Sequence, residues 1–287
     1  MTTGSAKPLS FEEGWPILQE EAINKLIHLV EGHSSNHFTS QEYMRIYTTV
    51  YNMCDKNNRA GPEALKLYSQ YKKTMEDYVS SKVLPSIQGK EDEMLLHELV
   101  KRWNNHKTMT RWLLRFFYYL ERYLIPKMRL PSLQETAYLA FYELVYGEMN
   151  DRVRDTVISL IDREREGEQI DQALVKNVLD IYVEMDEDSM KCYAKDFEES
   201  MSKDTSIFYS TKASDWIASK SYEDYMLKVE ECLKNEEGRI QSYLRYIRKI
   251  KLLEVCWLHR RIFSILMPIA ELVDVVFPPL LEICLTL

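Results

Sequence analysis

The sequence predicts an all-α protein, and three observations support that fold class. Apolar residues recur at steps of three and four through most of the chain, which is the period of a helix with one buried face. Only 8 glycines occur among 287 residues, so the tight turns that a β-rich fold needs are scarce. A content of 45% hydrophobic and 29% charged residues is typical of a soluble protein with a substantial core.

The first block of helices is expected between residues 11 and 127, after a disordered leader at 1–10. Ser10 and Glu13 form a capping box, and Pro16 predicts that the regular part of the first helix begins near Trp15. A second capping box and the pair Gly61-Pro62 open later helices. The predicted helices span about 15–29, 41–54, 62–84, 91–103 and 109–125.

A second block of similar length and helix count follows at 128–244. Its predicted helices span about 133–147, 151–166, 171–185, 189–218 with a break near 209–210, and 222–244. Two such blocks indicate tandem helical repeats, stacked so that each covers the apolar face of its neighbour. The repeat is inferred from architecture, because the residues of the two blocks are not obviously alike.

The net charge and the cysteine spacing limit the kinds of partner and the cellular environment that are expected for the chain. A formal net charge of −8 argues against binding to nucleic acid or to an anionic membrane surface. The five cysteines are far apart without a CxxC pair, which favours reduced thiols inside a cell. Prolines and acidic residues interrupt the apolar stretch 262–287, so no membrane span is expected. The predicted location is cytoplasmic and nuclear.

Motifs for catalysis or cofactor binding are not found in the sequence. A phosphate-binding glycine loop, a nucleophile elbow and HExxH are all missing, so we expect no catalytic residues, no cofactor and no metal. His33 and His37 have a ligand-like spacing, but they lie in a Ser/Asn-rich loop and a site needs further ligands. The acidic run "DREREGEQID" at 162–171 could serve a hydrolase, but its alternating arginines favour a solvated helix end with internal ion pairs.

The segment "QEYMRIYTTVYNMC" at 41–54 carries an unusual row of tyrosines. Helical spacing puts Tyr43 and Tyr47 on one face with Ile46, Val50 and Cys54, and puts Met44, Thr48 and Tyr51 beside it. One interpretation is core packing with the hydroxyl groups reaching water. The other is an exposed surface for a protein partner, because tyrosine and methionine are enriched at interfaces.

A later segment offers the same residue types at helical spacing. The stripe consists of Met109, Trp112, Arg115, Tyr119, Arg122 and Tyr123. Two such stripes within one helical block indicate a docking surface. The residues by themselves therefore support a helical scaffold with a protein interface.

Four stretches resemble the N-terminal half of a cullin, of the plant type that scaffolds SCF-type ubiquitin ligases. They are "YMRIYTTVYNMC", "LLHELVKRWNNHKTMTRWLLRFFYYLERYLI", "LIDREREGEQIDQALVKNVLDIYVE" and "YSTKASDWIASKSYEDYMLKVEECLKNEEGRIQSYL". The resemblance covers about residues 11–244. It implies a stalk of cullin repeats, each a five-helix bundle, that acts as a non-catalytic scaffold in ubiquitin-dependent degradation.

The resemblance also implies a partner and the residues that contact it. The second and fifth helices of the first repeat would hold a Skp-family adaptor that carries an F-box protein. The positions that match are Tyr43, Met44, Tyr47 and Tyr51 on the second helix and Tyr119 on the fifth. Helical geometry adds Met109, Trp112 and Arg115.

The chain departs from the cullin pattern at its C-terminal end. Cullins continue into a third repeat and a region that holds a RING-box subunit and a lysine for a ubiquitin-like modifier. Residues 245–287 do not resemble these parts, so we expect no RING-box partner. A truncated or mis-spliced product and a variant third repeat both remain open. The alternative function is a fragment that sequesters the adaptor or is inert.

Overall fold

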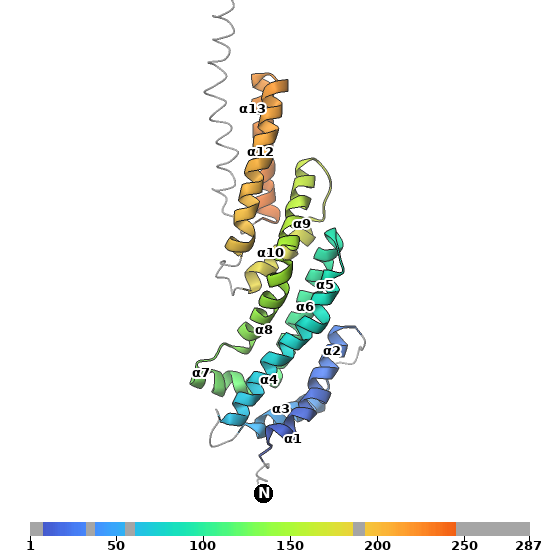
Figure 1. The fold of residues 1–287 in the computed structure, drawn as a ribbon, viewed down its shortest axis with the longest axis vertical. Helices are drawn as coiled ribbons and strands as arrows, with labels where there is room; N and C mark the ends of the chain where they lie inside the picture. Colours follow the sequence, from blue (N-terminus) through green and yellow to red (C-terminus); the bar gives the residue numbers. More distant parts are fainter. Residues whose placement is uncertain (1–7, 33–37, 55–60, 186–192, 245–287) are drawn as a thin grey trace, which may run out of the picture. The chain divides into compact units, whose positions relative to one another are not determined.

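The computed structural model describes residues 8–32, 38–54, 61–185 and 193–244 (Figure 1). All regular secondary structure within these residues is helical, which confirms the predicted fold class. The described residues form two compact units. One comprises residues up to 156 together with 180–185, and the other comprises 157–179 together with 193–244.

The first helix begins earlier than Pro16 predicts. Helix α1 spans Phe11–Leu18, because the Ser10 hydroxyl accepts the Glu13 N–H at 3.2 Å and the Glu13 carboxylate accepts the Ser10 N–H at 3.1 Å. Pro16 therefore lies inside the helix, where it removes a single N–H donor. A π-helical stretch Gln19–Asn24 and helix α2, Lys25–Val30, follow directly.

The next helices begin where the sequence predicts. Helix α3 spans Ser40–Met53 and has a complete capping box between Thr39 and Glu42. Helix α4 spans Pro62–Tyr78 with its proline in the first turn, and it runs through a π-helical stretch Val79–Val83 into α5, Leu84–Gln88. At Gly14, α1 and α3 meet so closely that a Cβ atom would come within 2.3 Å of Met53 Sδ.

The two helices predicted at 91–103 and 109–125 are joined in the structure. Helix α6 spans Asp92–Phe116 without a break. The polar residues between the two predictions fit the helix: His106 is buried with Nε2 2.8 Å from the Ala137 carbonyl oxygen, and Thr108 donates to the Asn104 carbonyl oxygen. A turn at Phe117 precedes a π-helical stretch Leu120–Leu124 and the short helix α7, Ile125–Met128.

Two of the breaks predicted in the second block, near 148–150 and near 209–210, are also missing. Helix α8, Leu133–Phe141, continues through a π-helical stretch Tyr142–Tyr146 into α9, Gly147–Arg165, because Gly147 takes helical backbone angles. Helix α10 spans Gln172–Met185. A π-helical stretch Ala194–Glu198 leads into α12, Glu199–Ser219, which has no break near 209–210, and α13 spans Tyr222–Ser242.

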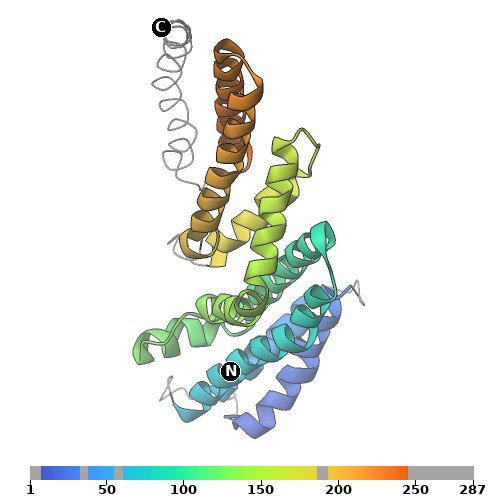
Figure 2. The ribbon, with the colours of Figure 1, turned by 45° about the horizontal axis from the view of Figure 1, so that its top comes forward.

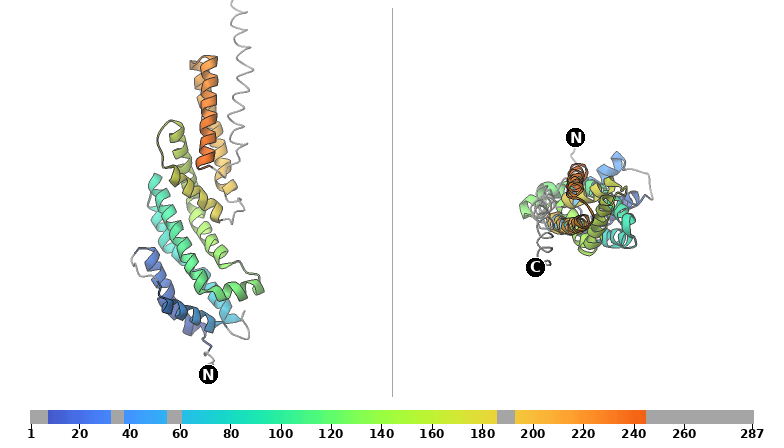
Figure 3. Two further views of the ribbon diagram at one scale, coloured as in Figure 1. Left: turned by 180° about the vertical axis from the view of Figure 1, so that it is seen from behind. Right: turned by 90° about the horizontal axis from the view of Figure 1, so that it is seen from above.

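Each unit has its own arrangement of helices. In the first, α6 packs against α2, α3, α5 and α8 (Figures 1 and 2). Trp103 and Phe116 on α6 are buried. In the second, α12 and α13 lie side by side as an antiparallel hairpin, which Figure 3 shows from behind. Ala213, Tyr225 and Val229 form a small core within this hairpin.

The compact units do not divide at the predicted repeat boundary. Helix α8 packs against α4 and α6 within the first unit. A compact unit and a repeat in the sequence are different divisions of a chain, so the repeats 11–127 and 128–244 stay predictions. In the predicted leader, the Leu9 N–H donates to the Asn52 carbonyl oxygen at 3.0 Å. The predicted tail at 245–287 lies outside the described residues.

Candidate docking surface

The tyrosine row of α3 lies at the border between core and surface. Ile46 and Val50 are fully buried, and Tyr43, Tyr47 and Tyr51 are half-buried. The rings of Tyr43 and Tyr47 stack with centroids 6.4 Å apart. The side chain of Met44 is 56% exposed. The two sequence interpretations therefore each hold in part: one side of α3 is core, and its outer edge presents aromatic rings and a methionine to solvent.

The aromatic residues of α6 and the following turn lie against this row. The Tyr43 ring is 5.9 Å from that of Phe116, and the Tyr51 ring meets Tyr119 edge-on at 5.4 Å. Trp112 is half-buried next to Phe116. The Arg115 guanidinium lies over the Trp112 ring, 5.4 Å from its centroid. The two predicted stripes thus form one surface in the first unit, which we call the α3/α6 surface.

The prediction that Met109 lies on this surface is wrong. Met109 is 0% exposed and shares the inner face of α6 with Leu113 and Phe116, which follow it at steps of four and three. Tyr119 is only 5% exposed, so it supports Tyr51 from beneath more than it offers a surface of its own. The turn at Phe117 shifts the helical phase of the residues that follow it, including Tyr119, whereas Met109 precedes the turn and is buried by its place on the inner face of α6.

Tyr118 is a surface residue that the sequence analysis missed. Its side chain is 47% exposed. The pKa of Arg122 is raised above its ordinary value, mainly by a hydrogen bond that its guanidinium donates to the Tyr118 hydroxyl, with contributions from Tyr123 and Tyr47. The continuous run "FFYY" carried the signal, because such a run must place one of its rings outward.

Ion pairs fix the end of α3 that begins the tyrosine row. Glu42 accepts from Lys25 Nζ at 2.6 Å and from the Thr39 N–H at 2.8 Å. The Lys25 contact, followed by the Thr39 bonds, lowers the pKa of Glu42 to about 2. Arg45 Nη2 lies 2.6 Å from Glu21 Oε1. These contacts hold α3 on the helices before it and so position Tyr43 and Met44.

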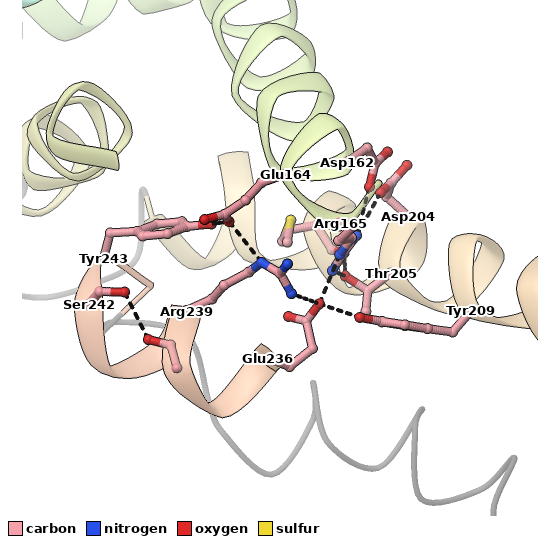
Figure 4. A network of polar contacts seen from close by, with 12 residues as sticks. Asp162, Glu164, Arg165, Asp204, Thr205, Tyr209, Glu236, Arg239, Ser242 and Tyr243 are labelled. Carbon is pink, nitrogen blue, oxygen red and sulfur yellow. Dashed lines mark hydrogen bonds and ion pairs between the residues drawn. The ribbon is translucent and has the colours of Figure 1, made fainter. Parts of the chain in front are cut away.

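The acidic run 162–171 is built into a polar network in the second unit, not a solvated helix end (Figure 4). Arg165, whose side chain is 1% exposed, donates from Nε to Glu236 Oε1 at 2.9 Å and from Nη1 to Asp162 at 2.8 Å. Its Nη2 donates to the Thr205 hydroxyl at 2.7 Å. The network therefore joins α9 to both α12 and α13.

Glu164 anchors the other half of the network. Arg239 Nε donates to it at 2.8 Å, and the Tyr243 hydroxyl also donates to it (Figure 4). The side-chain amide of Gln172 is a third donor. Burial acts to raise the pKa of Glu164, but these hydrogen bonds outweigh it and hold the pKa below its ordinary value. The solvated interpretation is wrong for Arg165 and Glu164; it holds for Glu166, which is exposed and pairs with Lys212.

This geometry favours a structural role for the run over hydrolysis. General acid–base chemistry needs carboxyl groups whose pKa values are driven apart in a cleft, whereas Glu164 is held ionised by three donors. Among the described residues, no group of three or more His, Cys, Asp or Glu side chains is placed to hold a metal ion. His33 and His37 lie outside that part of the chain. None of the helices in the described part of the chain has the length and apolar content that crossing a membrane requires.

Comparison with known proteins identifies the family. The family described as "Cullin alpha solenoid domain" matches residues 15–260, beyond the limit of 244 that the sequence analysis places on the resemblance. Rice (Oryza sativa subsp. japonica) Cullin-1 is 50% identical over 88% of this chain, but the chain spans only 34% of its length. Putative cullin-like protein 2 of Arabidopsis thaliana is 48% identical over 86% of this chain, and the chain spans 66% of its length. Cullin-like protein 3 of the same plant is 40% identical over 86% of this chain, and the chain spans 94% of its length. The chain belongs to the cullin family.

Proposed function

We propose that this chain is a non-catalytic scaffold of an SCF-type ubiquitin ligase, and that its α3/α6 surface binds a Skp-family adaptor with its F-box protein. Family membership supports the scaffold role, because a cullin holds other subunits in fixed positions. Rigid packing of α3 on α6 suits that task, since docking on a preformed surface avoids the cost of ordering it.

The exposure of Met44 among half-buried tyrosines is the observation that carries the proposal. A single exposed apolar side chain is ordinary on a soluble protein, but a cluster of apolar and aromatic side chains rimmed by polar residues marks an interaction site. Met44 is 56% exposed, with the rings of Tyr43 and Tyr47 beside it and Trp112 and Arg115 across on α6. Tyrosine, tryptophan and arginine dominate the hot spots of protein interfaces.

The same surface supports the alternative function of adaptor sequestration. A chain that binds the adaptor without recruiting a RING-box subunit would compete with a full-length cullin by mass action. We expect neither RING-box binding nor attachment of a ubiquitin-like modifier, and we place the protein in the cytoplasm and nucleus. Accumulation of ligase substrates when the chain is overproduced would favour sequestration over an inert fragment.

Co-precipitation tests the proposal. The purified full chain is mixed with a purified Skp-family adaptor bound to an F-box protein and, separately, with a RING-box protein. We expect recovery of the adaptor complex and no recovery of the RING-box protein. Lack of adaptor binding by a chain that shows a folded helical spectrum would refute the proposal.

A further inference from the structure

Three exposed arginines lie on or beside the α3/α6 surface. Arg111 and Arg115 lie one turn apart on α6, and Arg122 follows after the turn at Phe117. Arg102 and Arg154 in the same unit are held by carboxylates; Arg102 Nη1, for example, lies 2.6 Å from Glu31. Within the described residues, no carboxylate lies within ion-pair distance of Arg111, Arg115 or Arg122, whereas Arg45 at the edge of the same surface is paired with Glu21.

Two acidic side chains that adjoin residues of this surface in the sequence are engaged elsewhere. Glu42 is occupied by Lys25 and by the cap of α3. Glu121, the residue before Arg122, turns away and accepts the Leu133 N–H at 3.1 Å. The three arginines therefore keep their positive charge although the chain as a whole carries −8.

The groups that do contact these arginines are neutral. Arg115 lies over the Trp112 ring, and Arg122 lies 5.5 Å from the centroid of Tyr123 and donates to the Tyr118 hydroxyl. Aromatic rings orient a guanidinium and attract it, but they do not neutralise its charge. Both side chains are thus held in place with donors free for a carboxylate, which is the group their planar fork fits best.

We infer that the partner face which docks on the α3/α6 surface is acidic, with carboxylates opposite Arg111, Arg115 and Arg122 around an apolar socket for Met44. This inference rests on the proposed function and names the chemistry of the partner. A protein face fits better than a nucleic acid, because the exposed methionine needs an apolar contact that a phosphate backbone does not offer. Charges at the rim of such an interface act mainly on the rate of association.

The test measures association and dissociation rates of the full chain with a purified Skp-family adaptor and F-box complex. The variant pair Arg115→Gln and Arg122→Gln is compared with a matched control, Lys73→Gln and Lys234→Gln. Those lysines are exposed on α4 and α13, and their loss changes the net charge by the same amount. Rates are measured from roughly 0.02 M salt to about 1 M, where screening removes long-range attraction.

We expect the arginine pair to slow association about tenfold at the lowest salt and to converge with the unaltered chain at high salt. The lysine pair should change the rate much less. If the unaltered chain binds the adaptor complex but the arginine variant associates as fast as the lysine variant, the inference is overturned and the proposed function stands. No binding by the unaltered chain would overturn both. Tight binding of labelled RNA that the arginine pair abolishes would also contradict the inference.

Discussion

Arg165 on α9 and Glu236 on α13 form an ion pair that is almost completely removed from water. Arg165 Nε lies 2.9 Å from Glu236 Oε1, and the two side chains are 1% and 0% exposed. The same oxygen accepts from Arg239 Nη1 at 3.0 Å and from the Tyr209 hydroxyl at 2.6 Å. One carboxylate oxygen thus accepts from three donors on three helices, α9, α12 and α13, and is the centre of the polar network.

Glu236→Ala should be among the most destabilising changes in this unit. It leaves Arg165 buried without its main counter-charge, and breaking a buried pair costs about 3–5 kcal/mol. Replacing both partners, with Arg165→Met and Glu236→Leu, should cost less than the single change, because no charge is then stranded. Urea unfolding of the two variants checks this, and a single variant as stable as the unaltered chain would contradict the assigned geometry.

Glu164→Gln should lower the free energy of unfolding more than Glu166→Gln, although a solvated helix end, as the sequence suggests, would make both changes small. Glu164 is 16% exposed and accepts from Arg239, Tyr243 and Gln172, so losing its charge should cost about 1–3 kcal/mol. Glu166 is an exposed partner of Lys212 and should matter by less than about 1 kcal/mol. Neither change touches the α3/α6 surface, so adaptor affinity should stay constant. Equal denaturation midpoints would show that Glu164 is solvated.

Met109→Ala and Met44→Ala should separate core from surface on the two helices. Met109 is fully buried, and truncating a buried methionine costs about 2–5 kcal/mol. Met44 is exposed, so its removal should change stability by less than about 0.5 kcal/mol. The effect on adaptor affinity should be the reverse. The affinity should fall for Met44→Ala and stay unchanged for the folded fraction of Met109→Ala. The reverse pattern would restore the sequence-based assignment of Met109 to the surface.

Stability should fall as the pH drops from about 7 to 5, because His106 is buried in its neutral form. Burial lowers the pKa of His106 to about 4, against the Ala137 hydrogen bond, which acts to raise it. An unfolded histidine has a pKa of about 6.5, so acid protonates the unfolded chain first. The free energy of unfolding is therefore highest above pH 6.5 and falls between pH 6.5 and pH 4. At pH 5 it is about 2 kcal/mol lower than its value above pH 6.5.

The pH effect has two independent checks. His106→Gln should remove most of the slope between pH 7 and 5, since few folded-state carboxylates titrate in that range. An NMR titration of the unaltered chain should show no protonation of His106 above pH 5. A histidine signal that titrates near pH 6.5 would mean that the ring is accessible to water.

The fold and part of the surface could be predicted from the sequence because they depend on local signals. Helical periodicity gave the all-α class, and the capping residues before α3 and the Gly61-Pro62 pair located two helix starts. Helix ends were harder to predict: the residues 104–108 look like a loop, but the burial of His106 keeps α6 continuous, and the Thr108 hydroxyl is satisfied within the helix by the Asn104 carbonyl oxygen. Tertiary packing overrides weak local propensity in such cases.

The burial of single residues was harder to predict than the helices that carry them. Helical spacing allows Met109 to face either Trp112 or Leu113, and only packing shows that it lies with Leu113 on the inner face; Tyr119 follows the turn at Phe117, which changes the helical phase. The network around Arg165 was hidden for a different reason. Its partner Glu236 is far away in sequence, so only the folded chain reveals that the acidic run meets α13.

The adaptor affinity of the pair Tyr43→Ala and Met44→Ala tests the central proposal most directly. Calorimetric titration of the full chain with a Skp-family adaptor and F-box complex would be run beside circular dichroism, with Met94→Ala on α6 as the control for loss of an exposed methionine. Truncating central anchors typically costs about 2–4 kcal/mol, so affinity should fall roughly thirtyfold or more while helix content stays constant and the control binds normally. Unchanged affinity in the double variant, or loss of its helical spectrum, would contradict the assignment of this surface.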